Sequence, residues 1–388
     1  MTPIDDIVRF APELTRIRRD IHAHPETGFQ ETRTAALVAE KLGSWGIEVH
    51  AGIGKTGVVG IVRGARPGGR IGLRADMDAL PMEEATNAPH ASRHAGVFHG
   101  CGHDGHTTML LGAARYLANT RDFPGEIALI FQPAEEGLNG AAAMIADGLF
   151  SRFPCDEIYA LHNWPNSPLG HVSGKSGAAL AGSDNFDIVI TGKGAHAAQP
   201  ENAVDPIMVA VTLAQAIQTI VSRNVSPMRA AVLSITRIEA GSAYNIIPDT
   251  AKLAGTLRTF DTQVRELCLN RVRELASGME RAFGVTVEVK VRAGYKVLHN
   301  DPARMELALA AAREIVGADA VSVACDPIGG SEDFAEMLQH MPGAYLLIGQ
   351  GDSPALHNPA YDFNDALTPI GASLLARIAE RRAAGVAN

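Results

Sequence analysis

The stretch GEIALIFQPAEE (residues 125–136) is a short apolar run that ends in a proline and two adjacent acids. A run of this length, bounded by Gly and Pro, is typical of a buried strand. Three other stretches share this character: GVVGIVRG (57–64), GRIGLRADMD (69–78) and EIYALHNW (157–164). Strands that are apolar on both faces occur mainly in parallel sheets that helices cover on both sides.

Helical segments alternate with these strands. Apolar residues recur at helical spacing in four stretches of the first half: 4–25, 31–46, 106–120 and 139–150. The alternation returns near the C-terminus, with predicted helices over 301–317, 331–341 and 366–385 and a strand over 343–351. The order predicts an α/β fold with a mostly parallel sheet covered by helices.

A different order of elements interrupts this pattern. Six predicted elements run strand, helix, strand, strand, helix, strand: 184–192, 203–224, 229–240, 250–260, 261–284 and 285–295. This βαββαβ order is the ferredoxin-like motif. We therefore expect a discontinuous first domain, 1–183 plus 296–388, interrupted by an inserted domain over 184–295.

Composition excludes several classes of partner. The chain has 388 residues and a net charge of −9, which argues against binding to nucleic acid or to an anionic membrane surface. Its N-terminal stretch lacks a signal-peptide pattern, and no apolar run approaches the roughly 20 residues of a membrane span. The four cysteines are far apart, so we expect a reducing, cytoplasmic location.

Residues that can bind metal lie at or just beyond the ends of the predicted strands and in a loop that opens a predicted helix. They are Asp76 and Asp78, Glu135 and Glu136, His162, His357, and Cys101 and His103 within HGCGHDGHTT (99–108). An open α/β sheet places its sites at the carboxyl ends of its strands, so these side chains are expected at one edge. Each has a simpler interpretation as well: Cys101 as a small buried residue, the two glutamates as a solvated pair, and the histidines as core or surface residues.

The donor types indicate a catalytic metal site. A thiolate, three imidazoles and a carboxylate suit Zn²⁺, Mn²⁺ or a similar ion, and five donors exceed one tetrahedral site. Two ions that share a bridging ligand would use them all. Neighbours in an extended segment point in opposite directions, so one of Glu135 and Glu136 can bind metal while the other acts as a general base. Asp76 and Asp78 are expected to orient ligands, and His99 and His106 to support them.

Several motifs resemble those of the dinuclear-metal amidohydrolases, the family of aminoacylases, hippurate hydrolases, auxin-conjugate hydrolases and N-acetyldiaminopimelate deacetylases. The motifs are RRDIHAHPETGFQE (18–31), LRADMDALPMEE (73–84), HGCGHDGHTTMLLGAA (99–114), IFQPAEEGLNGA (130–141), LHNWP (161–165), GKGAHAAQP (192–200), GTLRTF (255–260), GGSEDFAEM (329–337) and LHNPAYDFND (356–365). They span nearly the whole chain in order. As a set they are highly specific.

The resemblance implies a role for each matching residue. Cys101, His103, Glu136, His162 and His357 would bind the metals, and Glu135 would be the acid/base. The inserted domain would be a lid that also mediates dimerisation. On it, His196 would stabilise the oxyanion, from its own or a partner's chain, and Asn245 and Arg258 would hold a substrate carboxylate.

One departure separates branches of the family. Carboxypeptidase-like and dipeptidase-like relatives carry His-x-Asp where this chain has Asp76-Met77-Asp78, and they lack the Cys101/His103 pair. The chain is therefore grouped with the N-acyl-amino-acid branch.

The resulting hypothesis is hydrolysis of the amide bond of a small N-acyl-amino acid. It requires two divalent ions, Mn²⁺ or Zn²⁺ with Ni²⁺ or Co²⁺ as alternatives, in a homodimer or dimer-based oligomer. Three rival interpretations stay open: a dipeptidase or carboxypeptidase, an enzyme with Cys101 as a nucleophile activated by His103, and a non-catalytic metal-binding or metabolite-binding protein.

Overall fold

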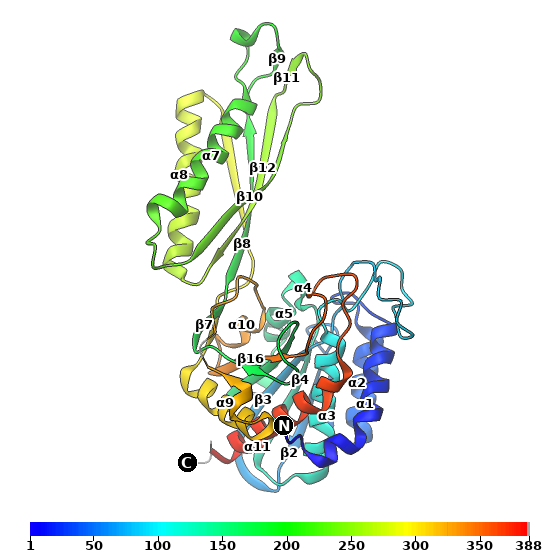
Figure 1. The fold of residues 1–388 in the computed structure, drawn as a ribbon. Helices are drawn as coiled ribbons and strands as arrows, with labels where there is room; N and C mark the ends of the chain where they lie inside the picture. The colour runs from blue at the N-terminus through cyan, green and yellow to red at the C-terminus, as the bar shows by residue number, and fades with distance from the viewer. Residues whose placement is uncertain (324, 386–388) are drawn as a thin grey trace. The chain divides into compact units, whose positions relative to one another are not determined.

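The structure is a computed structural model that describes residues 1–323 and 325–385. The chain forms two compact units, which Figure 1 traces from the N-terminus in blue to the C-terminus in red. The first unit comprises Met1–Ala179, His299–Asp326 and the described residues from Asp333 onward. The second comprises Leu180–Leu298 and Pro327–Glu332, a short segment that the sequence analysis had assigned to the first domain.

The first unit is built on an eight-stranded sheet in the order β1-β2-β4-β3-β5-β16-β6-β15. The strands are β1 (Glu48–Ile53), β2 (Gly57–Arg63), β3 (Arg66–Asp76), β4 (Pro124–Gln132), β5 (Glu157–Trp164), β6 (Val172–Ser173), β15 (Val321–Ser322) and β16 (Gly343–Gly349). The central strands β4, β3, β5 and β16 are parallel to one another, whereas β1 and β2 pair antiparallel with their neighbours. β6 is antiparallel to β16 and parallel to β15. The predicted α/β class is confirmed.

Helices cover this sheet. They are α1 (Asp5–Ala23), α2 (Thr32–Ser44), α3 (His103–Thr120), α4 (Glu135–Leu138), α5 (Gly140–Ala146), α6 (Leu149–Arg152), α9 (Pro302–Val316), α10 (Phe334–Met337) and α11 (Thr368–Gly385). α11 packs against β3, β4 and α3, and α1 packs against α3. A Cβ on Gly112 of α3 would lie only 2.8 Å from Ala372 Cβ, so small residues allow α3 and α11 to approach closely.

The second unit has the predicted ferredoxin-like fold. Its antiparallel sheet has the order β10-β12-β8-β13, with the strands β8 (Gly182–Thr191), β10 (Ala231–Ala240), β12 (Thr250–Thr259) and β13 (Thr286–Ala293). The helices α7 (Pro206–Asn224) and α8 (Thr262–Phe283) pack against it. An aspartate caps α8, because the side chain of Asp261 accepts the amides of Gln263 and Val264.

Short elements account for the main differences from the predictions. The helix expected over 331–341 is the four-residue α10, which begins at Phe334. The helix expected over 139–150 breaks into α5 and α6 at Gly148, whose φ of +89° is left-handed. The strands that were not predicted are the six-residue edge strand β1, the two-residue β6, β9 (Ala195–His196), β11 (Ile246–Ile247) and β15, and also β7 (Gly177–Leu180) and β14 (Leu298–Asn300).

Among the described residues, α7 alone has the length and apolar composition of a membrane span. Its buried side chains include Val209, Leu213, Ile217 and Ile220, which belong to the core of the second unit.

Candidate metal centre

The candidate site begins where three parallel strands end. β3 ends at Asp76 and β4 at Gln132, and these two residues are paired in register. β5 carries His162 near its end, paired with Leu347 of β16. The segments that follow β3 and β4 carry Asp78, Glu135 and Glu136. The site therefore has the position expected for an open α/β sheet.

A left-handed glycine places Cys101 and His103. Gly102 has a φ of +89°, and α3 begins at the next residue, so His103 lies in the first turn of the helix and not in the preceding loop. A Cβ at Gly102 would lie 2.5 Å from Asn163 Oδ1 and 2.6 Å from Tyr361 Oη. Only glycine fits here without displacing these two side chains.

The structure brings all five predicted ligands together. The donor atoms of Cys101, His103 and His162 lie within 4.8 Å of one another, and so do those of Cys101, Glu136 and His357. Cys101 belongs to both groups. The separation suits donors on opposite sides of one ion, since metal–ligand bonds to sulfur, nitrogen and oxygen are about 2.0 to 2.3 Å long.

Glu135 lies beside these donors. Its carboxylate forms a further group with His103 and Glu136, and the residue is 7% exposed. The turn that presents it is unusual, because Ala134 has a left-handed φ of +54° and Glu136 a ψ of 80° inside α4. His357 also has a left-handed φ, of +62°. Such conformations persist only where surrounding contacts fix them, and they are frequent at functional sites.

Asp78 holds this arrangement from behind. Its carboxylate accepts the backbone N–H groups of Glu135 and Glu136 at 3.0 and 2.9 Å, and its Oδ1 lies 3.2 Å from His103 Nδ1. An imidazole that donates from Nδ1 to a carboxylate leaves its Nε2 free to bind a cation. Asp78 thus contacts the base candidate and two ligand candidates at once.

Asp76 supports the site through a second imidazole. Its Oδ1 lies 2.6 Å from His106 Nδ1, and His106 Nε2 lies 2.6 Å from Asn163 Oδ1. The backbone carbonyl oxygen of Asn163 lies 2.7 Å from His162 Nδ1. This contact orients the ring so that His162 Nε2 faces Cys101 Sγ at 3.6 Å. Burial opposes ionisation of Asp76, but His103, Arg74 and His106 hold its pKa well below the usual range.

The charges around the site favour a cation. Burial and the neighbouring His106 lower the pKa of His162 well below its usual value, so this imidazole is a neutral donor. By contrast, the facing Cys101 and Glu136 raise the pKa of His357 to about 10. Burial opposes protonation of His103, yet Asp76 and Cys101 raise its pKa well above the usual value. Two imidazoles are therefore in an anionic field, which a divalent cation would also satisfy.

A buried atom supports the same conclusion. His103 Nε2 is fully buried and has no hydrogen-bond partner among the described residues, although such atoms almost always have one. It faces Glu136 Oε1 at 3.9 Å. A metal ion between them would satisfy both. The residues present thus fit a metal centre by distance, charge and donor type.

The remaining predicted residues lie in the second unit. His196 and Asn245 are exposed neighbours there: β9 pairs with β11, and Ala197 donates its N–H to the carbonyl of Asn245 at 3.0 Å. Arg258 is on β12 and donates from Nη1 to Ser331 Oγ at 2.5 Å. It lines a cavity of about 270 Å³ together with Val232 and Phe260.

The sequence analysis missed a buried ion-pair network on α1. Arg18, fully buried, donates to Asp362 and Asp365 at 2.9 and 2.7 Å and lies 3.4 Å from Asp104. His22 Nδ1 lies 2.7 Å from the same carboxylate of Asp104. Because Asp104 follows His103, and Asp362 and Asp365 follow His357, α1 holds both ligand-bearing segments. The only signal for these residues was their place in the quoted motifs, RRDIHAHPETGFQE for Arg18 and His22, HGCGHDGHTTMLLGAA for Asp104, and LHNPAYDFND for Asp362 and Asp365.

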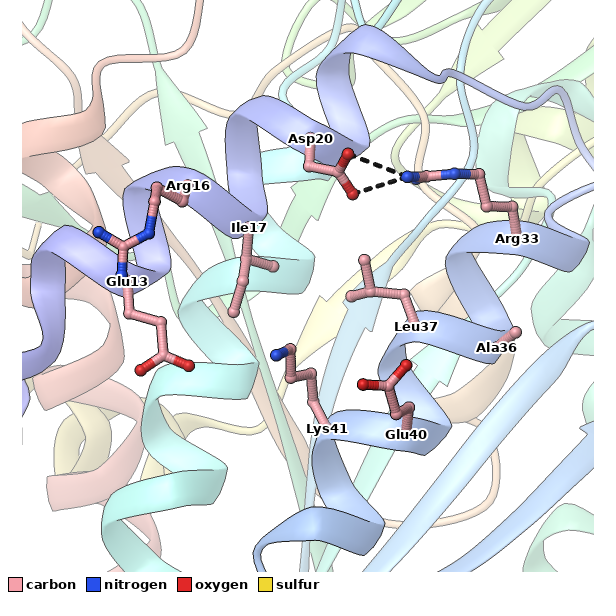
Figure 2. A pocket seen from close by; sticks show the side chains of 9 residues that line it. All are labelled: Glu13, Arg16, Ile17, Asp20, Arg33, Ala36, Leu37, Glu40 and Lys41. Atoms are coloured by element: carbon pink, nitrogen blue, oxygen red, sulfur yellow. Dashed lines mark hydrogen bonds and ion pairs between the residues drawn. The ribbon is translucent and has the colours of Figure 1, made fainter.

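A separate cleft of about 640 Å³ lies between α1 and α2 (Figure 2). Charged side chains line it, and two of them are paired, since Arg33 Nη2 lies 2.9 and 2.7 Å from the two carboxylate oxygens of Asp20. None of the predicted metal ligands lines this cleft. It is therefore not the candidate site.

Comparison with known proteins identifies the family. The model of Peptidase family M20/M25/M40 matches residues 72–381, which include all five donors and Glu135. The chain belongs to this family. This match confirms the resemblance that the motifs indicated. The chain is a hydrolase of the M20/M25/M40 family.

Known proteins align with this M20/M25/M40 chain over nearly its whole length. Its sequence is 42% identical over 379 residues to that of the hippurate hydrolase of Campylobacter jejuni. The alignment covers 98% of this chain and 99% of that protein. It is also 41% identical over 354 residues to the N-acetyl-L-cysteine deacetylase of Bacillus subtilis. That alignment covers 91% of this chain and 84% of the deacetylase. The structure also superposes on a crystal structure of the Bacillus subtilis YxeP protein, a dinuclear metal binding peptidase from the M20 family. The TM-score is 0.85 at 33% sequence identity, and the superposition covers 97% of this chain and 99% of YxeP.

Proposed function

We propose that the chain hydrolyses the amide bond that joins an acyl group to an amino acid. The observation that carries this proposal is the set of five donors that separate segments bring together, with Glu135 beside them; Cys101, His103 and His162 are buried, Glu136 is half-buried and His357 is exposed. Relatives named for hippurate hydrolysis and N-acetylcysteine deacetylation support the same class of bond. The substrate is thus a small molecule with an N-acyl group on an amino acid.

Two divalent ions, Mn²⁺ or Zn²⁺ with Ni²⁺ or Co²⁺ as alternatives, are the cofactors we propose. Cys101, His103 and His162 would hold one, and Cys101, Glu136 and His357 the other, with the thiolate shared. When bound, such ions lower the pKa of a water and polarise the substrate carbonyl. The M20 family neighbour that binds a dinuclear metal supports two ions.

The chain's own residues would carry the proton transfers. Glu135 would take the proton of the attacking water and later give it to the leaving amine. Asp78 holds the backbone of Glu135, so the carboxylate keeps its aim during both steps. On the second unit, His196 would stabilise the oxyanion, and Asn245 or Arg258 would hold the substrate carboxylate, which an Arg fork binds well.

We also propose roles for the two parts of the chain. Residues 1–183 and 296–388 would form the catalytic metal-binding domain, and 184–295 the lid and dimerisation domain. The strand β10, at an edge of its sheet and with Val232 58% and Ile238 54% exposed, is the surface we assign to the partner chain of a homodimer. With all four cysteines unpaired, the cytoplasm is the location we propose.

A paired substitution tests the mechanism. Glu135→Gln should keep both metal ions and lose turnover by about 100-fold or more, because only the acid/base is removed. Glu136→Gln, its chain neighbour, should instead lower metal occupancy. Amine release from hippurate, N-acetylcysteine and other N-acyl-amino acids would be measured with metal content determined on the same samples, before chelation, after it, and after metal add-back.

The rival interpretations give different results. Full turnover by Glu135→Gln at normal metal content would refute the assigned base. Activity that survives complete chelation would favour Cys101 as a nucleophile. Hydrolysis of dipeptides alone would favour the peptidase alternative.

A further inference from the structure

The segment HPETGFQE (24–31) ends in a carboxylate for which the proposed mechanism has no use. Glu31 directly precedes α2, and its side chain is fully buried. A buried carboxylate is costly unless hydrogen bonds satisfy it. Its partners therefore indicate what it does.

Both oxygens of Glu31 have a donor. Oε2 accepts the hydroxyl of Thr56 at 2.6 Å, and Oε1 accepts the backbone N–H of Ala134 at 2.8 Å. Asp78 accepts the next two amides, those of Glu135 and Glu136. Three consecutive backbone N–H groups of the turn thus donate to two buried carboxylates.

The same segment packs against the turn at a second point. A Cβ on Gly28 would lie 3.0 Å from Ala134 Cβ and 2.8 Å from Leu138 Cδ1. The carbonyl of Glu26 also accepts the N–H of Ala79 at 2.8 Å, one residue beyond Asp78. Residues 26–31 therefore run along both the turn and the chain segment that holds it.

The turn needs such support. Ala134 has a left-handed φ of +54°, which a residue with a side chain adopts only at an energetic cost. Glu31 bonds the amide of this very residue. Without that bond, the backbone before Glu135 is free to relax towards ordinary conformations, and the carboxylate of Glu135 would move with it.

We propose that Glu31 is a positioning residue: through the Ala134 amide it fixes the backbone that aims Glu135 at the reacting water. This inference rests on the proposed role of Glu135. Displacement of a catalytic group by about 1 Å lowers turnover by up to about 100-fold, so loss of this bond should lower kcat by about 10-fold to 100-fold with KM and metal content little changed.

Four variants separate this role from simple packing. Glu31→Gln keeps an acceptor oxygen at the same reach and should resemble the wild type. Glu31→Leu removes the acceptor at similar volume, and Glu31→Asp withdraws it by one methylene in case the Leu variant fails to fold. Thr56→Val is the matched control, since it removes the other hydrogen bond of Glu31 and leaves the Ala134 bond in place.

Amide hydrogen exchange across residues 133–138 gives a readout that needs no substrate. We expect exchange at Ala134 and Glu135 to rise at least 10-fold in the Leu and Asp variants and to stay near the wild-type rate in the Gln and Val variants. The kcat values should follow the same order. Unchanged exchange in both Glu31→Leu and Glu31→Asp would overturn the inference.

The two proposals fail in different ways. If exchange rises as expected but no N-acyl-amino acid is hydrolysed by any form, the anchoring of the turn stands and the proposed function fails. If the wild type hydrolyses these substrates and Glu31→Asp does so equally well with a folded chain, Glu31 has no positioning role.

Discussion

Asp78 shows how one side chain can organise a site that it does not enter. It accepts two backbone amides and lies within hydrogen-bond distance of His103 Nδ1, so base and ligand candidates share one anchor. Carboxylates in this position fix the tautomer and orientation of a metal-binding imidazole. The motif LRADMD indicated an orienting role, and the contacts of Asp78 support that prediction.

We predict that Asp78→Ala lowers metal affinity by about 10-fold to 100-fold, as is usual when an outer partner of a ligand is removed. Competition with a chromophoric chelator measures the affinity. Asp147→Asn is the control, because Asp147 also accepts a backbone amide, that of Gly54, but belongs to none of the donor groups described above. Equal affinity in Asp78→Ala and the wild type would contradict this account.

At the scale of the element, α1 has a polar patch within an apolar stripe. Leu14, Ile17 and Ile21 are buried at helical spacing, and the fully buried Arg18 and His22 share that face. Buried charges require partners, and Asp104, Asp362 and Asp365 supply them. The helix therefore stabilises the fold through ion pairs as well as apolar contacts.

This network predicts a loss of stability in alkali. Burial opposes the protonation of His22, but Asp104 and Glu84 raise its pKa to about 9. A pKa raised on folding contributes stability that is complete below the unfolded value, about 6.5, and is lost as the pH rises through 9. We expect the free energy of unfolding to fall by about 2 to 3 kcal/mol over this range.

Urea unfolding in chelator at pH 6.5, 8 and 9.5 measures this loss. His22→Gln should be less stable at the lowest pH and should lack most of the decline. His50→Gln is the control, because His50 is a partly exposed histidine paired with Glu48 on β1. A decline of equal size in His22→Gln would show that another group is responsible.

At the scale of the whole molecule, the proposed dimer can be tested at the edges of the second sheet. Ile238→Lys places a charge on an exposed apolar position of β10, and it should convert a dimer to a monomer. Thr286→Lys, on the opposite edge strand β13, should leave the dimer intact. Light scattering after gel filtration gives the masses. A dimer that survives Ile238→Lys would exclude this edge.

Local patterns were enough to predict the main elements and the candidate ligands. The apolar run before Glu135 is strand β4, and the run that contains His162 is strand β5. Both were predictable because a strand buried on both faces is apolar along its whole length. The βαββαβ order of the second unit was predicted in the same way. Short elements escaped prediction: two-residue strands such as β6 and β15 have too few residues to show a period.

The sequence by itself determined the α/β class, the inserted ferredoxin-like unit and the residue types that can hold a cation, since these follow from periodicity and motif. Only the tertiary structure decided the partners. Glu31 bonds an amide 103 residues away, and Arg18 a carboxylate 347 residues away. Such contacts depend on which buried donors need an acceptor once the chain has folded, and no local pattern encodes that requirement.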